Sequence, residues 1–229
     1  MELQDVRGGT KQDLDAYLYN IGVGISLGNK WFTVDNIVEL IAWSLPRTRD
    51  KVIVYVADSI HAINLEVRNK ISPKAALRRA LERGTKILSE VRETAAAAFS
   101  PEDSEKIVYA TWSDLVDETY KEKVAYLYEL YVSNTEFAEY IKNIVRNSVA
   151  KEEKTFSDEE ITRLGHYILE ELPELISRPL IQGVPCDAYV YPFAGEIAPL
   201  AERIQNGEIF PEIKTHILNT EPKVFLEVR

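Results

Sequence analysis

The stretch Gly24-Ile25-Ser26-Leu27-Gly28-Asn29 decides how this chain is interpreted. A short apolar run precedes it and a helical pattern begins near Thr33, so the stretch is expected to connect a strand to a helix. Glycines at 24 and 28 let the backbone bend sharply and let a substrate approach closely. In an open α/β sheet, ligands bind at this end of the strands. Ser26 is therefore a candidate nucleophile, although an ordinary strand-to-helix turn with a capping serine has the same pattern.

The same stretch also fits the Gly-x-Ser-x-Gly elbow of serine hydrolases. The histidines of the chain are His61, His166 and His216, so Asp187 and His216 would have to complete a triad in the order Ser, acid, His. An elbow serine needs a sheet and an oxyanion loop built before it, and only 25 residues precede Ser26. The hydrolase is therefore the weaker alternative.

Composition and periodicity predict one α/β domain over residues 1–229. The chain is 45% hydrophobic, which is ample for a single buried core. Strand-like and helical stretches alternate, which is typical of a mainly parallel sheet with helices on both faces. The predicted strands cover 18–25, 51–57, 107–110, 186–191 and 223–228. The predicted helices cover 34–45, 73–92, 114–149 with a break near Ser133-Asn134, 157–172 and 197–204, and 100–103 is expected to be a loop.

Composition also excludes several kinds of site. The single cysteine, Cys186, rules out an intramolecular disulfide and a cysteine-rich zinc site. Three scattered histidines argue against a histidine-rich metal centre, and no metal or cofactor is expected. The chain shows no signal-peptide pattern and no apolar run long enough to span a bilayer. We therefore expect a cytoplasmic protein without a membrane partner, acting as a monomer.

Positive charge is concentrated in one segment of this acidic chain. Eight basic and two acidic residues lie between Arg68 and Arg92, a net charge of +6 in a chain whose total is -10. Pro73 follows Ser72 at a favoured helix start, and the expected buried stripe consists of Leu77, Leu81, Gly84, Leu88 and Val91. The basic face either tracks a phosphate backbone or is an ordinary solvated surface. Its candidate phosphate contacts are Lys74, Arg78, Arg79, Arg83 and Lys86.

A tyrosine and two carboxylates form a third candidate group. Tyr167, Glu171 and Glu174 lie at i, i+4 and i+7 and so share one helix face, and Pro173 is expected to end or kink the helix beside them. Such a group can bind an ammonium ion and move protons, although a solvent-exposed acidic helix end has the same pattern.

Taken in order along the chain, these residues resemble those of the cyclodipeptide synthases, from Gly22 to about Phe210. The resemblance depends on an ordered set: Gly-Ile-Ser26-Leu-Gly-Asn29 followed by Trp31-Phe32, the strand from Val52 to Asp58 with His61 and Asn64 after it, the basic helix, Tyr167-x-x-x-Glu171-Leu-Pro, and a late Tyr-Pro. It implies a Rossmann-like fold similar to the catalytic domain of class I aminoacyl-tRNA synthetases. It also implies an enzyme that converts two aminoacyl-tRNAs into a cyclic dipeptide. The ATP motifs of the synthetases and a Walker A loop are missing from the sequence, which fits a substrate that arrives already activated.

The resemblance also implies a role for each candidate residue. Ser26 would carry an aminoacyl group and then a dipeptidyl group, while Tyr167 and Glu171 would hold the amino group, with Glu171 as the base. A late tyrosine would relay the proton during ring closure. Tyr191 is the better match, and Tyr189 stays open because it shares the same strand face. The basic helix, 73–92, would bind tRNA. The pocket is expected to include Gly24, Asn29, Val54, Tyr55, Glu174 and Leu175.

Two positions depart from the family pattern. Asn29 is typical of one group of these enzymes and Pro192 of the other, so the subgroup stays open. In the family, the position three residues after the glutamate usually helps line the first aminoacyl pocket and is usually apolar. Here that position is Glu174. An acid there is costly if it is buried without a partner, so we expect a polar or cationic first side chain, with histidine as the specific guess because Tyr55 can stack beside its ring. If Glu174 faces solvent instead, it has no bearing on the pocket.

One alternative from another class also remains. A non-catalytic tRNA-binding module of the same fold would keep the basic helix but would not need Ser26.

Overall fold

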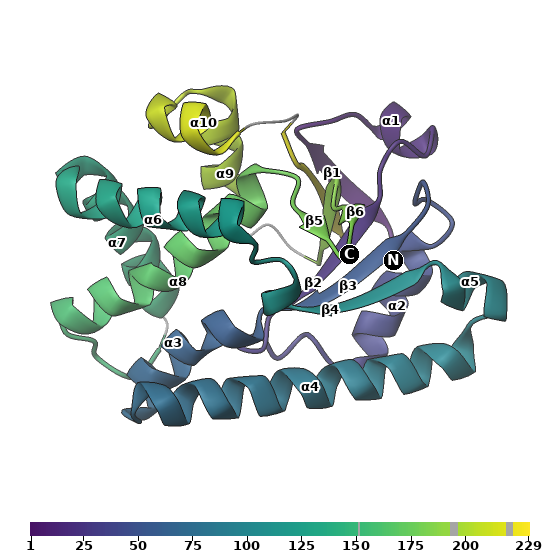
Figure 1. Cartoon of the computed structure of the whole chain (residues 1–229), viewed down its shortest axis with the longest axis horizontal. Helices are drawn as coiled ribbons and strands as arrows, with labels where there is room; N and C mark the ends of the chain where they lie inside the picture. Colours follow the sequence, from purple (N-terminus) through teal and green to yellow (C-terminus); the bar gives the residue numbers. More distant parts are fainter. Residues whose placement is uncertain (151, 193–196, 219–221) are drawn as a thin grey trace.

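The computed structural model describes residues 1–150, 152–192, 197–218 and 222–229 (Figure 1). These residues include a six-stranded sheet with the strand order β1-β8-β7-β2-β3-β4. The strands are β1 (Leu3–Arg7), β2 (Ile21–Ile25), β3 (Val52–Val56), β4 (Ile107–Thr111), β7 (Ala188–Tyr191) and β8 (Val224–Val228). All neighbouring pairs from β8 to β4 are parallel, and β1 is antiparallel to β8 at one edge. The predicted α/β fold with a mainly parallel sheet is confirmed.

Helices cover both faces of this sheet. α2 (Val34–Ser44) and α4 (Pro73–Ala98) pack on one face, and α4 runs along the bottom in Figure 1. Gathered at the left in Figure 1 are α6 (Glu118–Ser133), α7 (Thr135–Val149), α8 (Asp158–Ile176), α9 (Ile197–Asn206) and α10 (Pro211–Ile217). α3 (Asp58–Asn69) packs against both α4 and α8. Shorter elements are α1 (Lys11–Asp15), α5 (Pro101–Glu105), the 3₁₀ helix at Trp112–Asp114 and the hairpin of β5 (Leu180–Ile181) and β6 (Val184–Pro185).

The alternation of side chains in β3 separates two cores. Val52, Val54 and Val56 are buried with α2 and α4, whereas Ile53 and Tyr55 point to the opposite face. Successive strand side chains point to opposite faces of a sheet, so Val54 and Tyr55 cannot share one pocket. The expectation that Val54 lines the pocket is therefore wrong, and Tyr55 is the residue of this strand on the pocket side.

The position of β2 explains why ligands would bind beside it. β2 lies between β3 and β7, so the strand order reverses on either side of it. In parallel sheets, the crevice outside the carboxyl ends of the strands at such a reversal is the usual ligand site. Ser26 follows β2 directly and so lies at this crevice.

Several predicted boundaries need correction. α8 begins with the capping box of Ser157 and Glu160 and continues through Pro173 to Ile176, because Leu172 and the residues that follow it are buried in the helical core. The predicted loop at 100–103 instead begins the short helix α5. The break near Asn134 is confirmed, since Asn134 ends α6 and caps α7.

The buried stripe of α4 also differs from the prediction. Leu77 and Leu81 are 42% and 40% exposed, whereas Ala76 and Ala80 are buried. α3 packs closely against α4, and small side chains permit that approach. At Gly84, an added Cβ would lie 2.5 Å from the Cβ of Asp58 in α3.

Across the described parts of the chain, none of the helices combines the length and the apolar character that crossing a membrane requires.

Candidate active site

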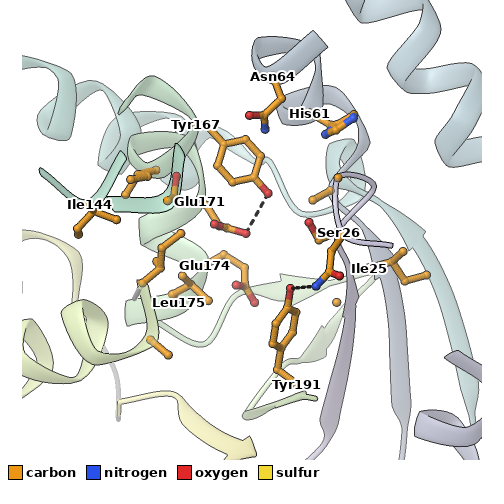
Figure 2. Close-up of a pocket in the computed structure, with 18 of the residues that line it drawn as sticks. Ile25, Ser26, His61, Asn64, Ile144, Tyr167, Glu171, Glu174, Leu175 and Tyr191 are labelled. Carbon is orange, nitrogen blue, oxygen red and sulfur yellow. Dashed lines mark hydrogen bonds between the residues drawn. The ribbon is translucent and has the colours of Figure 1, made fainter. Parts of the chain in front are cut away.

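A cavity of about 950 Å³ opens beyond the carboxyl ends of β2 and β3 (Figure 2). Its walls come from β2 and the turn after it, from β3, from α8 and from β7, which are far apart in the sequence. The structure brings together every predicted catalytic and pocket residue except Val54: Gly24, Ser26, Asn29, Tyr55, Tyr167, Glu171, Glu174, Leu175, Tyr189 and Tyr191. His61 and Asn64, at the start of α3, also line it.

Ser26 is held in a tight turn between β2 and α2. Its carbonyl oxygen accepts a hydrogen bond from the Asn29 amide at 3.1 Å, and the Asn29 side chain accepts one from the Trp31 amide at 3.0 Å. Ser26 is half-buried and borders the cavity. Gly24, two residues before Ser26, leaves space for the ring of Tyr189, because a Cβ at this position would lie 2.4 Å from that ring.

Tyr167 and Glu171 lie side by side on α8, as their spacing predicted. The Tyr167 hydroxyl donates to Glu171 Oε1 at 3.3 Å (Figure 2). Burial raises the pKa of Glu171 to about 8, assisted by repulsion from Glu174 and opposed by the hydrogen bond from Tyr167. Burial also raises the pKa of Tyr167 well above its ordinary value. In the free protein this carboxyl group is therefore mostly protonated at neutral pH, and a bound ammonium group would favour its ionised form, which can accept a proton.

The two late tyrosines occupy different positions in the cavity. The Tyr191 hydroxyl accepts a hydrogen bond from Asn29 Nδ2 at 3.4 Å (Figure 2). Burial raises the pKa of Tyr191 to about 12, although hydrogen bonds with Asn29 and Ser26 act in the opposite direction. Tyr189 stacks on Tyr191, with ring centroids 5.5 Å apart, and packs under Gly24. Tyr191 is thus the tyrosine of this strand whose hydroxyl lies beside Ser26.

Glu174 is buried and has a partner that the sequence analysis missed. Its side chain is 2% exposed, so it does not face solvent. Glu174 Oε1 accepts a hydrogen bond from the Tyr55 hydroxyl at 2.5 Å and forms an ion pair with the ammonium group of Lys223. The two charged residues are 49 positions apart, and no local pattern in the sequence connects them.

Arg83 differs from the other basic residues of α4. Its Nη2 donates to the Leu27 carbonyl oxygen at 2.9 Å, and its Nη1 lies 3.3 Å from His61 Nε2. Burial lowers the pKa of His61 to about 4, assisted by the charge of Arg83, so the imidazole is neutral. The basic helix therefore touches the turn that carries Ser26. Arg83 and the other four candidate phosphate contacts are all exposed: Lys74, Arg78, Arg79 and Lys86.

The triad of the serine-hydrolase alternative is not assembled. His216 lies on α10, where its ring stacks on Tyr126 with centroids 4.1 Å apart. Asp187 precedes β7 at its opposite end and accepts a hydrogen bond from the Asn20 amide at 2.9 Å. Neither residue lines the cavity beside Ser26. Within the described ranges, no three His, Cys, Asp or Glu side chains are grouped so that they could hold a metal ion.

Comparison with known proteins identifies both the family and the fold. The family model of the cyclodipeptide synthases matches residues 20–214. No curated protein sequence gives a significant match. A cyclodipeptide synthase from Bacillus thermoamylovorans has a similar structure, with a TM-score of 0.74 and 21% identity over 100% of this chain and 97% of that chain.

Two further solved structures are also similar. A Mycobacterium tuberculosis protein, described as relating cyclodipeptide synthetases to type I tRNA synthetases, has a TM-score of 0.71 and 20% identity over 100% of this chain and 96% of its own. A cyclodipeptide synthase from Candidatus Glomeribacter gigasporarum, solved with Phe-tRNAPhe bound, has a TM-score of 0.54 and 18% identity over 92% of this chain and 87% of its own. These structures share the synthetase-like Rossmann fold. Because the family model matches most of its length, the chain belongs to the cyclodipeptide synthase family.

Proposed function

We propose that this protein is an aminoacyltransferase that converts two aminoacyl-tRNAs into a cyclic dipeptide through acylated Ser26. The observation that carries the proposal is the shared cavity, in which Ser26 lies with the Tyr167–Glu171 pair and with Tyr191. Membership of the cyclodipeptide synthase family supports the reaction, and the relative with bound Phe-tRNAPhe supports the substrate. Aminoacyl-tRNAs are made in the cytoplasm, so we propose that the protein acts there.

The first step acylates Ser26. Its Oγ attacks the ester carbonyl of one aminoacyl-tRNA, the bond to the terminal ribose breaks, and the released ribose hydroxyl takes the proton. An aminoacyl ester is a reactive acyl donor, so this exchange of one ester for another does not require a full serine triad. A reaction without a triad agrees with the positions of two histidines: the His61 ring is neutral and contacts Arg83, and His216 lies on α10 against Tyr126.

The second step forms the peptide bond. The α-ammonium group of aminoacyl-Ser26 binds beside Tyr167 and Glu171, and its positive charge favours the ionised form of Glu171. The Glu171 carboxylate then removes a proton from the ammonium group. The free amine attacks the ester of a second aminoacyl-tRNA, whose ribose leaves as the hydroxyl. Asn64 and Arg68 of α3 and Asn147 of α7 also line the cavity, and we propose that the second aminoacyl group lies against them.

The third step closes the ring. The new terminal amine attacks the ester carbonyl on Ser26, the bond to Oγ breaks, and Oγ regains a proton. We assign the relay of that proton to Tyr191, because its hydroxyl accepts a hydrogen bond from Asn29 in the turn that carries Ser26. The released product is a diketopiperazine. Its first side chain is expected to be polar, with histidine as the specific candidate, because Glu174 and Tyr55 line the same cavity.

Mass spectrometry of the culture medium tests the proposed function. Cells that express the protein should release a diketopiperazine that is missing from cells with an empty vector, and purified protein should form the same compound from charged tRNA. Soluble, folded protein that binds charged tRNA without forming a diketopiperazine would instead support the non-catalytic tRNA-binding module.

The raised pKa of Glu171 predicts a pH-dependent stability difference for Glu171→Gln. The folded protein holds the Glu171 proton up to a pH of about 8, whereas the unfolded chain loses it near the ordinary value of 4.5. The native state therefore binds more protons between these values, and its stability falls as pH rises through the window. Glutamine cannot ionise, so the variant should gain stability relative to the wild type by up to about 1.4 kcal/mol per pH unit there.

Denaturant unfolding at several pH values measures this difference. Glu122→Gln, on the exposed surface of α6, is the control and should show no such gain. A Glu171→Gln difference that stays constant between pH 4.5 and pH 8 would contradict the raised pKa of Glu171.

A further inference from the structure

Lys223 is a fully buried lysine directly behind the cavity wall. It precedes β8, its side chain is 0% exposed, and it does not itself line the cavity. Its Nζ forms an ion pair with the Glu174 carboxylate and lies 3.3 Å from the Glu174 carbonyl oxygen. The rings of Tyr55 and Tyr189 lie 5.9 and 5.6 Å from it. The ammonium group therefore contacts the wall of the cavity from behind.

The charges of this group balance. Burial by itself lowers the pKa of Lys223, but the ion pair with Glu174 acts in the opposite direction; the net shift of the pKa is upward, so the ammonium group stays charged. Burial raises the pKa of Cys186 to about 11, so its thiol is neutral. The Lys223 ammonium group is paired with the Glu174 carboxylate, so the cavity wall presents a carboxylate that already has a cation.

Stability alone does not explain the pair. Replacing a buried ion pair with apolar residues of similar volume is often neutral or stabilising, whereas removing one partner leaves an uncompensated charge. An apolar wall would need neither residue. The position of Glu174 in the cavity with Ser26 instead suggests that the pair acts on the substrate.

We propose that Lys223 determines which charge the first aminoacyl pocket accepts: it neutralises Glu174, so that the pocket selects an uncharged side chain that donates a hydrogen bond. This inference rests on the proposed function. A hydroxyl, an amide or a neutral imidazole N–H can donate to the Glu174 carboxylate without adding charge. A lysine or arginine side chain would bring a second cation toward the Lys223 ammonium in a site of low dielectric, where repulsion between like charges is strong. Lys223 is a positioning and selecting residue and does not touch the reacting atoms.

The test measures which amino acid is loaded onto Ser26. Purified protein is incubated with tRNA preparations that each carry one amino acid, and the aminoacyl adduct is read from the intact protein mass. The wild type should load an uncharged hydrogen-bond donor at least about tenfold better than lysine or arginine, a ratio that corresponds to about 1.4 kcal/mol. Lys223→Met leaves Glu174 without its cation, so its relative loading of lysine and arginine should rise by at least about tenfold.

The double variant Glu174→Leu/Lys223→Met removes both charges. It should fold even if Lys223→Met does not, and it should load leucine, methionine or phenylalanine in preference to the donor. Lys123→Met is the matched control. Lys123 donates to Ser177 Oγ at 3.3 Å and does not line the cavity, so this variant should keep the wild-type preference.

The outcomes separate the inference from the proposed function. If the wild type forms no adduct with any aminoacyl-tRNA, the proposed function fails. If it forms adducts but loads lysine or arginine as well as the uncharged donors, the inference alone is overturned. The same conclusion follows if the variants keep the wild-type preference. If neither Lys223→Met nor the double variant folds, the pair is structural, and the inference is likewise overturned.

Discussion

Ser26→Ala is expected to lower diketopiperazine formation by at least about 1,000-fold, because the variant lacks the oxygen that carries the acyl group. The fold should not change. The turn is held by main-chain and Asn29 hydrogen bonds, and the Ser26 carbonyl oxygen that accepts from Asn29 is kept. Product is measured by mass spectrometry at equal concentrations of soluble protein, with thermal unfolding as the check on folding.

Ser59→Ala provides the control for this substitution. Ser59 lies in α3 and does not line the cavity, so its alanine variant should keep wild-type turnover. Turnover by Ser26→Ala within a few fold of the wild type would show that another group carries the acyl chain.

Reversing three charges on α4 is expected to weaken aminoacyl-tRNA binding by orders of magnitude. The variant changes Lys74, Arg79 and Lys86 to Glu, which removes three attractions to phosphate and adds three repulsions. All three side chains are exposed. Arg83 is left in place because its guanidinium group donates to the Leu27 carbonyl oxygen, so changing it would also disturb the turn of Ser26. Wild-type affinity should fall with salt, with a log–log slope of about -0.7 to -0.9 per phosphate contact.

A matched triple reversal separates tRNA docking from a general effect of charge. Lys11, Lys121 and Arg229 are also exposed but lie outside α4. Changing them to Glu alters the net charge by the same amount and should have a much smaller effect on the dissociation constant. Equal losses in the two variants, or a wild-type affinity that does not depend on salt, would contradict the assignment of α4 as the tRNA-binding surface.

Local patterns predicted how Tyr167 and Glu171 lie relative to each other, because both residues belong to one helix. The i, i+4 spacing of Tyr167 and Glu171 became a hydrogen bond of 3.3 Å within α8. The glycines around Ser26 marked the turn after β2. The alternation of strands and helices in the sequence predicted the parallel sheet. The strand order of this sheet reverses at β2, and the turn after β2 therefore lies at the cavity.

The wrong predictions concern positions where a shift of one residue, or a contact between distant elements, decides which side chain is buried or lines the cavity. Val54 and Tyr55 are adjacent, and a shift of one residue along a strand reverses the face of the sheet, so assigning both to one pocket was wrong for Val54. Leu77 looked like part of a buried stripe, but close packing of α3 buries the neighbouring Ala76 instead.

Lys223 shows the limit of sequence reasoning most clearly. Lysine is almost never fully buried unless it is paired, so a lysine before a strand is normally expected to be exposed. Its partner, Glu174, lies 49 residues away, and the parallel pairing of β7 with β8 belongs to the fold as a whole. The charge of the pocket therefore became visible only when the sheet and α8 were assembled.

The mass of the intact protein during the reaction tests the central claim most directly. Wild-type protein mixed with one kind of aminoacyl-tRNA should gain the mass of one aminoacyl group, and peptide mapping should locate that group on Ser26. Ser26→Ala should gain none. An adduct on the alanine variant, or wild-type protein that releases diketopiperazine while no acyl group is ever found on Ser26, would contradict the covalent mechanism.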